Sequence, residues 1–74
     1  MLEKRQWLIE YRGDKTQESV AKDANIARSY YVQIETGTRN PSVQIAKKIA
    51  EVLDFDWTIF FNESGREKQH KEVV

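Results

Sequence analysis

Three glycines and one proline divide the chain into short segments, and this division limits the folds that are open to it. The glycines are at positions 13, 37 and 65, and the proline is at position 41. Between these breaks, apolar residues recur at intervals of three and four residues, which is the spacing of one face of an α-helix. The sequence therefore predicts several short helices.

The chain is long enough for one small domain with a thin core. It has 74 residues and no cysteine, so disulfides and thiolate metal sites do not supplement the packing of apolar side chains. Residues 1–61 carry the helical patterns, whereas the composition of residues 62–74 is typical of a charged, disordered tail. No apolar run approaches the roughly 18 residues of a membrane span, so we expect no membrane partner and a cytoplasmic location.

The first predicted helix carries an apolar stripe and ends near Gly13. The stripe consists of Trp7, Leu8 and Tyr11. Thr16 is a suitable N-cap for a second helix, residues 17–24, in which Ala21 is small enough for a close crossing. Asn25 tolerates the left-handed conformation that turns a chain sharply after a helix. Two short helices joined by such a turn predict a helix-turn-helix.

The third predicted helix, residues 28–36, is polar on one face only. The inward face carries Tyr31, Ile34 and Glu35, and the outward face carries Arg28, Ser29, Val32, Gln33 and Thr36. Ala27 occupies the N-cap and lacks a side-chain oxygen, which costs about 1 kcal/mol relative to Ser or Thr. In a DNA-binding helix-turn-helix, a second helix with these two faces enters the major groove.

A fourth helix begins after Pro41 and Ser42 and has the strongest apolar pattern in the chain. Its broad apolar face consists of Val43, Ile45, Ala46, Ile49, Ala50, Val52 and Leu53. Asp56 is then an N-cap candidate for a short fifth helix that carries Trp57, Ile59, Phe60 and Phe61. Two interpretations of Trp57, Phe60 and Phe61 stay open: they complete the core, or part of the cluster forms a two-fold dimer interface.

The sequence offers few groups for catalysis or metal binding. It has no cysteine, one histidine in the charged tail, no glycine-rich phosphate loop and no carboxylate pair at a helical-face spacing. We therefore expect neither an enzyme nor a site for a cofactor or a metal.

A set of short motifs runs through most of the chain. They are Thr-Gln-Glu at 16–18, Arg-Ser-Tyr at 28–30, Ile-Glu-x-Gly at 34–37, Arg-Asn-Pro-Ser at 39–42 and Lys-Ile-Ala-x-x-Leu at 48–53. Together they resemble the phage-repressor-like helix-turn-helix family, also called Xre or Cro-like. The resemblance extends from Trp7 to about Phe61. It implies an all-α fold, a compact five-helix bundle of the lambda-repressor-like DNA-binding type, with the helix-turn-helix at helices 2 and 3.

The resemblance also implies a function and a set of contacts. The expected function is that of a small transcriptional repressor that binds a palindromic or pseudo-palindromic operator in double-stranded DNA as a homodimer. The base contacts would come from Arg28, Ser29, Val32 and Gln33. The backbone contacts would come from Gln17, Tyr30, Thr36, Thr38, Arg39 and Asn40. The family's usual partner for Glu35 is the arginine that closes helix 1, which predicts a structural ion pair between Arg12 and Glu35.

Other functions stay open at this point. An antitoxin that binds both DNA and a toxin, with the tail as the toxin-binding segment, is a close variant. Twelve basic and twelve acidic residues cancel to a net charge of zero, which leaves room for a protein-interaction module that has lost DNA binding. In that case the polar face of the third helix is an ordinary solvated surface. Salt-dependent duplex binding separates the two functions.

Overall fold

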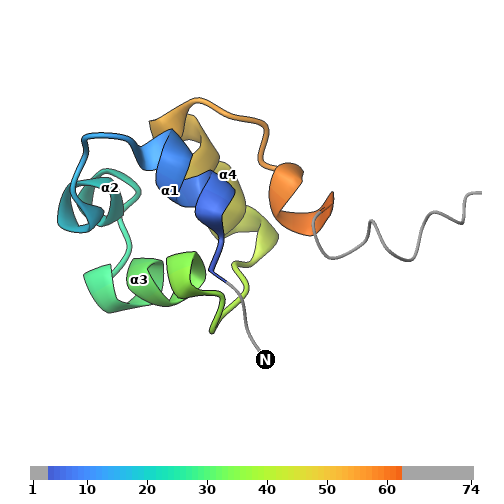
Figure 1. The fold of residues 1–74 in the computed structure, drawn as a ribbon, viewed down its shortest axis with the longest axis horizontal. Helices are drawn as coiled ribbons and strands as arrows, with labels where there is room; N and C mark the ends of the chain where they lie inside the picture. Colours follow the sequence, from blue (N-terminus) through green and yellow to red (C-terminus); the bar gives the residue numbers. More distant parts are fainter. Residues whose placement is uncertain (1–3, 63–74) are drawn as a thin grey trace, which may run out of the picture.

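The computed structural model describes residues 4–62, and its regular elements are all helical. They are α1 (Gln6–Arg12), α2 (Gln17–Asp23), α3 (Arg28–Thr36) and α4 (Val43–Leu53), followed by one further helical turn at residues 59–62 (Figure 1). The predicted bundle of five helices is confirmed, with residues 59–62 as its short fifth member. Apart from Asn62, the predicted disordered tail lies outside the described residues. Within residues 4–62, no helix is long and apolar enough to cross a membrane.

Side-chain caps lie at the starts of three of these elements, and the sequence predicts two of them, Thr16 and Asp56. Thr16 and Ser42 each accept a hydrogen bond from the backbone N–H three residues later, at 3.0 and 3.2 Å. Asp56 accepts two bonds from Thr58, one from its backbone N–H at 3.0 Å and one from its hydroxyl at 2.8 Å. These two bonds lower the pKa of the exposed Asp56 carboxyl. Each cap satisfies backbone donors that the first turn of a helix leaves without a partner.

The turn between α2 and α3 is built around a left-handed residue. Asn25 has φ of 61°, and the N–H of Ile26 donates to the carbonyl of Ala21 at 2.9 Å, which closes the end of α2. Ala21 is 1% exposed, so its small side chain permits the close packing of α2 on α3. The backbone therefore has the helix-turn-helix arrangement that the spacing predicts.

The core lies between the helices and receives at least one side chain from each of them. Its members include Leu8 of α1, Val20 of α2, Tyr31 and Ile34 of α3, and Ile49 of α4, all at 0% exposed. Burial of one such side chain contributes about 1.5–3 kcal/mol. The packing holds the inward face of α3 and leaves the opposite face of that helix at the surface.

The three C-terminal aromatic residues differ in burial. Phe60 is 2% exposed and packs 5.0 Å from the ring of Trp7, centroid to centroid, so it completes the core of the monomer. Trp57 is half-buried beneath Lys47, whose Nζ lies 5.1 Å from the centroid of the indole ring. Phe61 is 38% exposed. Of these three side chains, Trp57 and Phe61 therefore keep exposed surface, whereas Phe60 does not.

The uncapped start of α3 gives a stability prediction. Ala27 has φ of −67° and ψ of 144°, the extended conformation of an N-cap, but it makes no side-chain cap bond. Ala27→Ser should add that bond and stabilise the fold by about 1 kcal/mol, which raises the melting temperature by about 4–8 °C. Circular dichroism during heating measures the change. Ala27→Val is the control because it adds bulk without an acceptor, and an equal rise in both variants would contradict the capping explanation.

Candidate nucleic-acid interface

Helix α3 lies at the edge of the bundle and has two unlike faces. It runs along the lower edge of the molecule in Figure 1, with α2 beside its first turn. Tyr31, Ile34 and Glu35 are buried, whereas Arg28 and Ser29 are exposed. The other three outward residues, Val32, Gln33 and Thr36, are half-buried. The five side chains that the sequence assigns to the outward face therefore all reach the surface.

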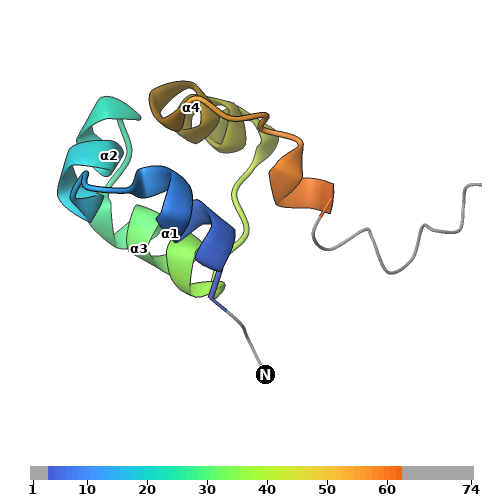
Figure 2. The same ribbon diagram turned by 45° about the horizontal axis from the view of Figure 1, so that its top comes forward.

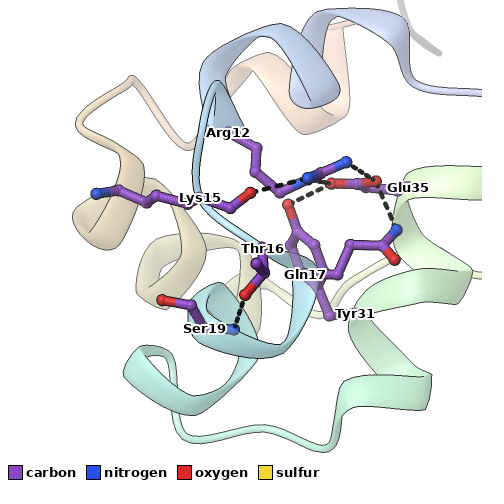
Figure 3. A network of polar contacts seen from close by, with 7 residues as sticks. All are labelled: Arg12, Lys15, Thr16, Gln17, Ser19, Tyr31 and Glu35. Atoms are coloured by element: carbon purple, nitrogen blue, oxygen red, sulfur yellow. Dashed lines mark hydrogen bonds and ion pairs between the residues drawn. The ribbon is translucent and has the colours of Figure 1, made fainter.

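A buried carboxylate joins the three helices around this site. Glu35 is 2% exposed, and the side chains that surround its two carboxylate oxygens come from α1, α2 and α3 (Figure 3). Arg12 donates from Nε to Oε2 at 2.6 Å and from Nη2 to Oε1 at 3.3 Å. The Tyr31 hydroxyl donates to Oε2 at 2.7 Å, and Gln17 Nε2 donates to Oε1 at 2.9 Å. The predicted ion pair between Arg12 and Glu35 is thus present, within a larger network.

The electrostatics of the network favour the charged form of Glu35. Burial would raise the pKa of the carboxyl, but hydrogen bonds from Arg12, Tyr31 and Gln17, together with the positive charge of Arg12, lower it below its usual value. The bond to Glu35 raises the pKa of Arg12, against the opposing effect of burial. Burial and the contact with Glu35 raise the pKa of the Tyr31 hydroxyl. Glu35 therefore holds α3 against α1 and α2 as a carboxylate with four hydrogen bonds.

The lowered pKa of Glu35 predicts a loss of stability in acid. A carboxyl whose pKa is lower in the folded state stabilises the fold above its unfolded pKa, about 4.3, and loses this contribution as the pH falls through the folded pKa. At pH values below about 5, the free energy of unfolding should therefore decrease. Urea unfolding of the wild type and of Glu35→Gln across this pH range isolates the effect. The difference in free energy of unfolding between the two proteins should shrink in acid, where Glu35 becomes protonated. A constant difference would contradict the prediction.

One residue of the network, Gln17, is also a predicted phosphate contact. Gln17 uses an amide hydrogen for Glu35, and its side chain is half-buried at the start of α2. The second amide hydrogen and the backbone N–H of the first helical turn remain the donors through which Gln17 could contact a phosphate. The bond to Glu35 orients the amide, and the sequence interpretation did not include it.

A second cluster lies on the outward side of α3. Arg39 donates from Nε to the Gln33 side-chain oxygen at 2.9 Å, and its Cζ lies 5.2 Å from the centroid of the Tyr30 ring. The Nε bond leaves both terminal nitrogens of this exposed guanidinium as donors that are suited to a phosphate. A predicted base-contact residue and two predicted backbone-contact residues are thus brought together by the fold.

The loop after α3 is ordered by its own bonds. The Thr36 hydroxyl contacts the Gln33 carbonyl oxygen at 3.1 Å and the Thr38 hydroxyl at 3.0 Å. The N–H groups of Thr38 and Arg39 donate to the same Gln33 carbonyl. Thr38, Arg39 and Asn40 are exposed at the end of the outward face of α3. The predicted backbone-contact loop therefore lies next to the predicted base-contact residues.

The local charge of this surface differs from that of the whole chain. Between residues 25 and 42 the charged side chains are Arg28, Glu35 and Arg39. Glu35 is buried and paired, so the exposed charges of this segment are the two arginines. A surface with two positive charges and several hydrogen-bonding side chains suits a phosphate backbone, although the net charge of the chain is zero.

Arg5 is the residue that the sequence interpretation missed. It is 6% exposed and donates to two backbone carbonyls and to the side chain of Asn40. In the sequence it stands in a charged run, Glu-Lys-Arg, which is typical of solvated surface. Its partners lie 29 to 35 positions away, so no local spacing identifies them.

Comparison with known proteins gives a family and relatives for this chain. The model of the Helix-turn-helix family matches residues 6–60. An uncharacterized HTH-type transcriptional regulator of Bacillus subtilis (strain 168), YqaF, is 56% identical over 68 residues, which cover 89% of this chain and 90% of YqaF.

Solved structures show the same arrangement of helices. The N-terminal DNA binding domain of SinR from Bacillus subtilis is 32% identical, with a TM-score of 0.67 over 76% of this chain and 86% of that domain. The restriction-modification controller protein C.AhdI from Aeromonas hydrophila is 36% identical, with a TM-score of 0.67 over 76% of this chain and 88% of that protein.

Proposed function

Because the chain belongs to the Helix-turn-helix family, we propose that it is a transcriptional repressor that binds a specific operator in double-stranded DNA through the outward face of α3. The observation that carries this proposal is the division of α3 into an anchored face and an exposed face that bears Arg28 and Ser29. The chain is a regulator of this family and not an enzyme. Residues 1–61 form the proposed DNA-binding domain, which would act in the cytoplasm of a bacterium or of a phage host.

The outward face would read the edges of bases in the major groove. Arg28 suits guanine, whose O6 and N7 accept two hydrogen bonds, and the Gln33 amide suits adenine. Ser29 can bond to several bases, and Val32 can contact a thymine methyl group. Because the buried Ile34 and Glu35 hold the inward face of α3 against the bundle, the side chains on its outward face have defined positions before DNA binds. We assign direct readout to Arg28, Ser29, Val32 and Gln33.

The flanking residues would hold the DNA backbone. Arg39 supplies a charged guanidinium with two terminal donor groups, and the ring of Tyr30 packs against this guanidinium. Gln17 is the first residue of α2, where backbone N–H groups lack intrahelical partners, as a phosphate contact at a helix N-terminus requires. We assign backbone contacts to Gln17, Tyr30, Thr36, Thr38, Arg39 and Asn40, which set the register of α3 in the groove.

A homodimer would match a palindromic operator, because two half-sites one DNA turn apart require two copies related by a two-fold axis. The half-buried Trp57 and the exposed Phe61 are the proposed centre of the dimer interface. Phe61→Glu should shift sedimentation from dimer to monomer, since a charge would be buried in an apolar contact. Tyr11→Glu is the control because Tyr11 is a 46% exposed aromatic on α1 and should leave the mass unchanged. If Phe61→Glu remained a dimer, Phe61 would not be part of the interface.

Selection of bound duplexes from a random library at low salt tests the whole proposal. We expect enrichment of a two-fold symmetric motif with half-sites about one turn apart. Affinity for this duplex should fall linearly with the logarithm of salt concentration, because phosphate contacts release counterions. Salt-sensitive binding without enrichment would leave a DNA-binding protein that does not read sequence, which would contradict the assigned base contacts.

A protein-interaction function is the second candidate, and the net charge of zero is the observation that favours it. In this case the fold would present a surface to a protein, and in an antitoxin-type regulator that partner would be a toxin. The two candidates differ at low salt, where an interaction module without DNA binding leaves every duplex in the library unbound. Duplex binding together with a co-purifying toxin would indicate the antitoxin variant.

A further inference from the structure

Arg5 connects the start of α1 to the end of α3 and to the loop after it. Its Nη1 donates to the carbonyl oxygen of Ile34 at 2.6 Å and to that of Arg39 at 3.3 Å, and its Nη2 donates to Oδ1 of Asn40 at 2.6 Å. Its backbone N–H donates to the carbonyl of Glu35 at 2.8 Å. Figures 1 and 2 both place the start of α1 beside the end of α3.

These bonds fix the loop from the inner side. A guanidinium is planar and rigid, so acceptors bonded to it are held at set positions relative to one another. One acceptor belongs to the last turn of α3, and the other two belong to Arg39 and Asn40. The ring of Phe60 lies 5.7 Å from the guanidinium carbon and limits its movement on another side. The loop is therefore tied to α1 as well as to α3.

The bond also sets the orientation of a proposed phosphate contact. Because Oδ1 of Asn40 faces Arg5, the amide nitrogen of Asn40, with its two donor hydrogens, is on the other branch of the side chain. Asn40 is exposed, and a donor at this position is the group that a phosphate oxygen requires. In Arg39, the main chain is held by Arg5 while the guanidinium lies on the outer surface with Gln33 and Tyr30.

We propose that Arg5 is a positioning residue for DNA binding, which sets the loop at residues 37–40 so that Arg39 and Asn40 meet the phosphate backbone. Arg5 is 6% exposed, so it acts through the loop and not by touching DNA. The inference rests on the proposed function, because it assigns a cause to the backbone contacts of that function. It adds the buried N-cap residue of α1 to a site that is otherwise built from α2, α3 and the loop.

The test uses Arg5→Lys, which keeps the positive charge but replaces the planar fork by a single ammonium. The probe is the duplex enriched in the selection, together with a mixed-sequence duplex of equal length. Arg5→Lys and Asn40→Ala should each lower affinity for both duplexes about tenfold. The double variant should lose little more affinity than either single variant, because Arg5 acts through the loop to which Asn40 belongs. Lys4→Arg, a swap at the exposed neighbouring position, should leave affinity unchanged.

Two further measurements separate positioning from a general loss of stability. All affinities are measured at a temperature at which circular dichroism shows every variant to be folded. In free Arg5→Lys, the amide NMR signals of residues 37–40 should shift while those of α2 stay in place. Wild-type affinity in Arg5→Lys, or losses that multiply in the double variant, would overturn the inference and leave the proposed function standing. A wild-type chain that binds no duplex would overturn the proposed function instead.

Discussion

Arg12→Ala should lower the free energy of unfolding by about 3–5 kcal/mol, because it leaves the carboxylate of Glu35 buried without its charged partner. The Glu35 side chain is 3% exposed and that of Arg12 is 19% exposed, so water replaces little of the lost interaction. The substitution also removes the bond from Arg12 to the carbonyl of Lys15 in the loop between α1 and α2. For a domain of this size, such a loss is a large part of the total stability, which is about 5–15 kcal/mol. Urea unfolding followed by circular dichroism measures it.

The cause of this loss can be separated from the loss of packing around Arg12. In the Arg12→Ala background, Glu35→Gln should restore part of the stability, since a neutral amide is less costly to bury than an unpaired carboxylate. For the same reason, the difference in free energy of unfolding between Arg12→Ala and the wild type should become smaller in acid, where Glu35 becomes protonated. An Arg12→Ala protein that is as stable as the wild type would show that the ion pair does not hold the helices together. A double variant no more stable than Arg12→Ala would assign the loss to packing.

Arg28→Ala should lower affinity for the selected operator by about ten- to a hundredfold, which corresponds to the loss of one bidentate base contact. It should also relax the sequence preference at one position of each half-site. The fold should be unaffected, since Arg28 is exposed at the start of α3 and a surface substitution of this kind changes stability by about 0.5 kcal/mol or less. Repetition of the selection with the variant measures both effects.

Arg39→Ala is the matched comparison, because it removes the same charge from the loop instead of the helix. This variant should bind all duplexes more weakly, and the slope of log affinity against log salt should fall by about one. Its preference at the position that Arg28 reads should stay the same, because Arg39 bonds to the side chain of Gln33 and not to that of Arg28. If Arg28→Ala kept the wild-type preference and only weakened binding, Arg28 would belong with the backbone contacts and the assignment of direct readout to it would be wrong.

Local patterns predicted most of the secondary structure. Helix α3 begins and ends at the residues that the sequence indicates, Gly37 ends it with φ of 85°, and the caps at Thr16 and Asp56 form as expected. Each of these features depends on residues within about four positions of one another, where backbone geometry leaves few alternatives. The inward and outward faces of α3 follow from the same periodicity. The Arg12–Glu35 pair required more, since it was inferred from the family resemblance and not from spacing.

Long-range partners could not be predicted in this way. The neighbours Phe60 and Phe61 differ in burial because the last helical turn packs one ring against Trp7 and leaves the other at the surface. Gln17 and Glu35 are 18 positions apart and meet only once α2 and α3 have packed. Arg5 is the strongest case, because two of its acceptors are backbone carbonyls, which every residue possesses and which therefore leave no trace in a sequence.

The amino-acid order thus specified the helices, their caps and the polar face that we assign to DNA, because these depend on short-range geometry and on the period of the α-helix. The packed fold selected which side chains share a partner: the four bonds around Glu35, the burial of Phe60 and the loop held by Arg5. These contacts join groups that are far apart in the chain, and their distances are set by how the helices pack.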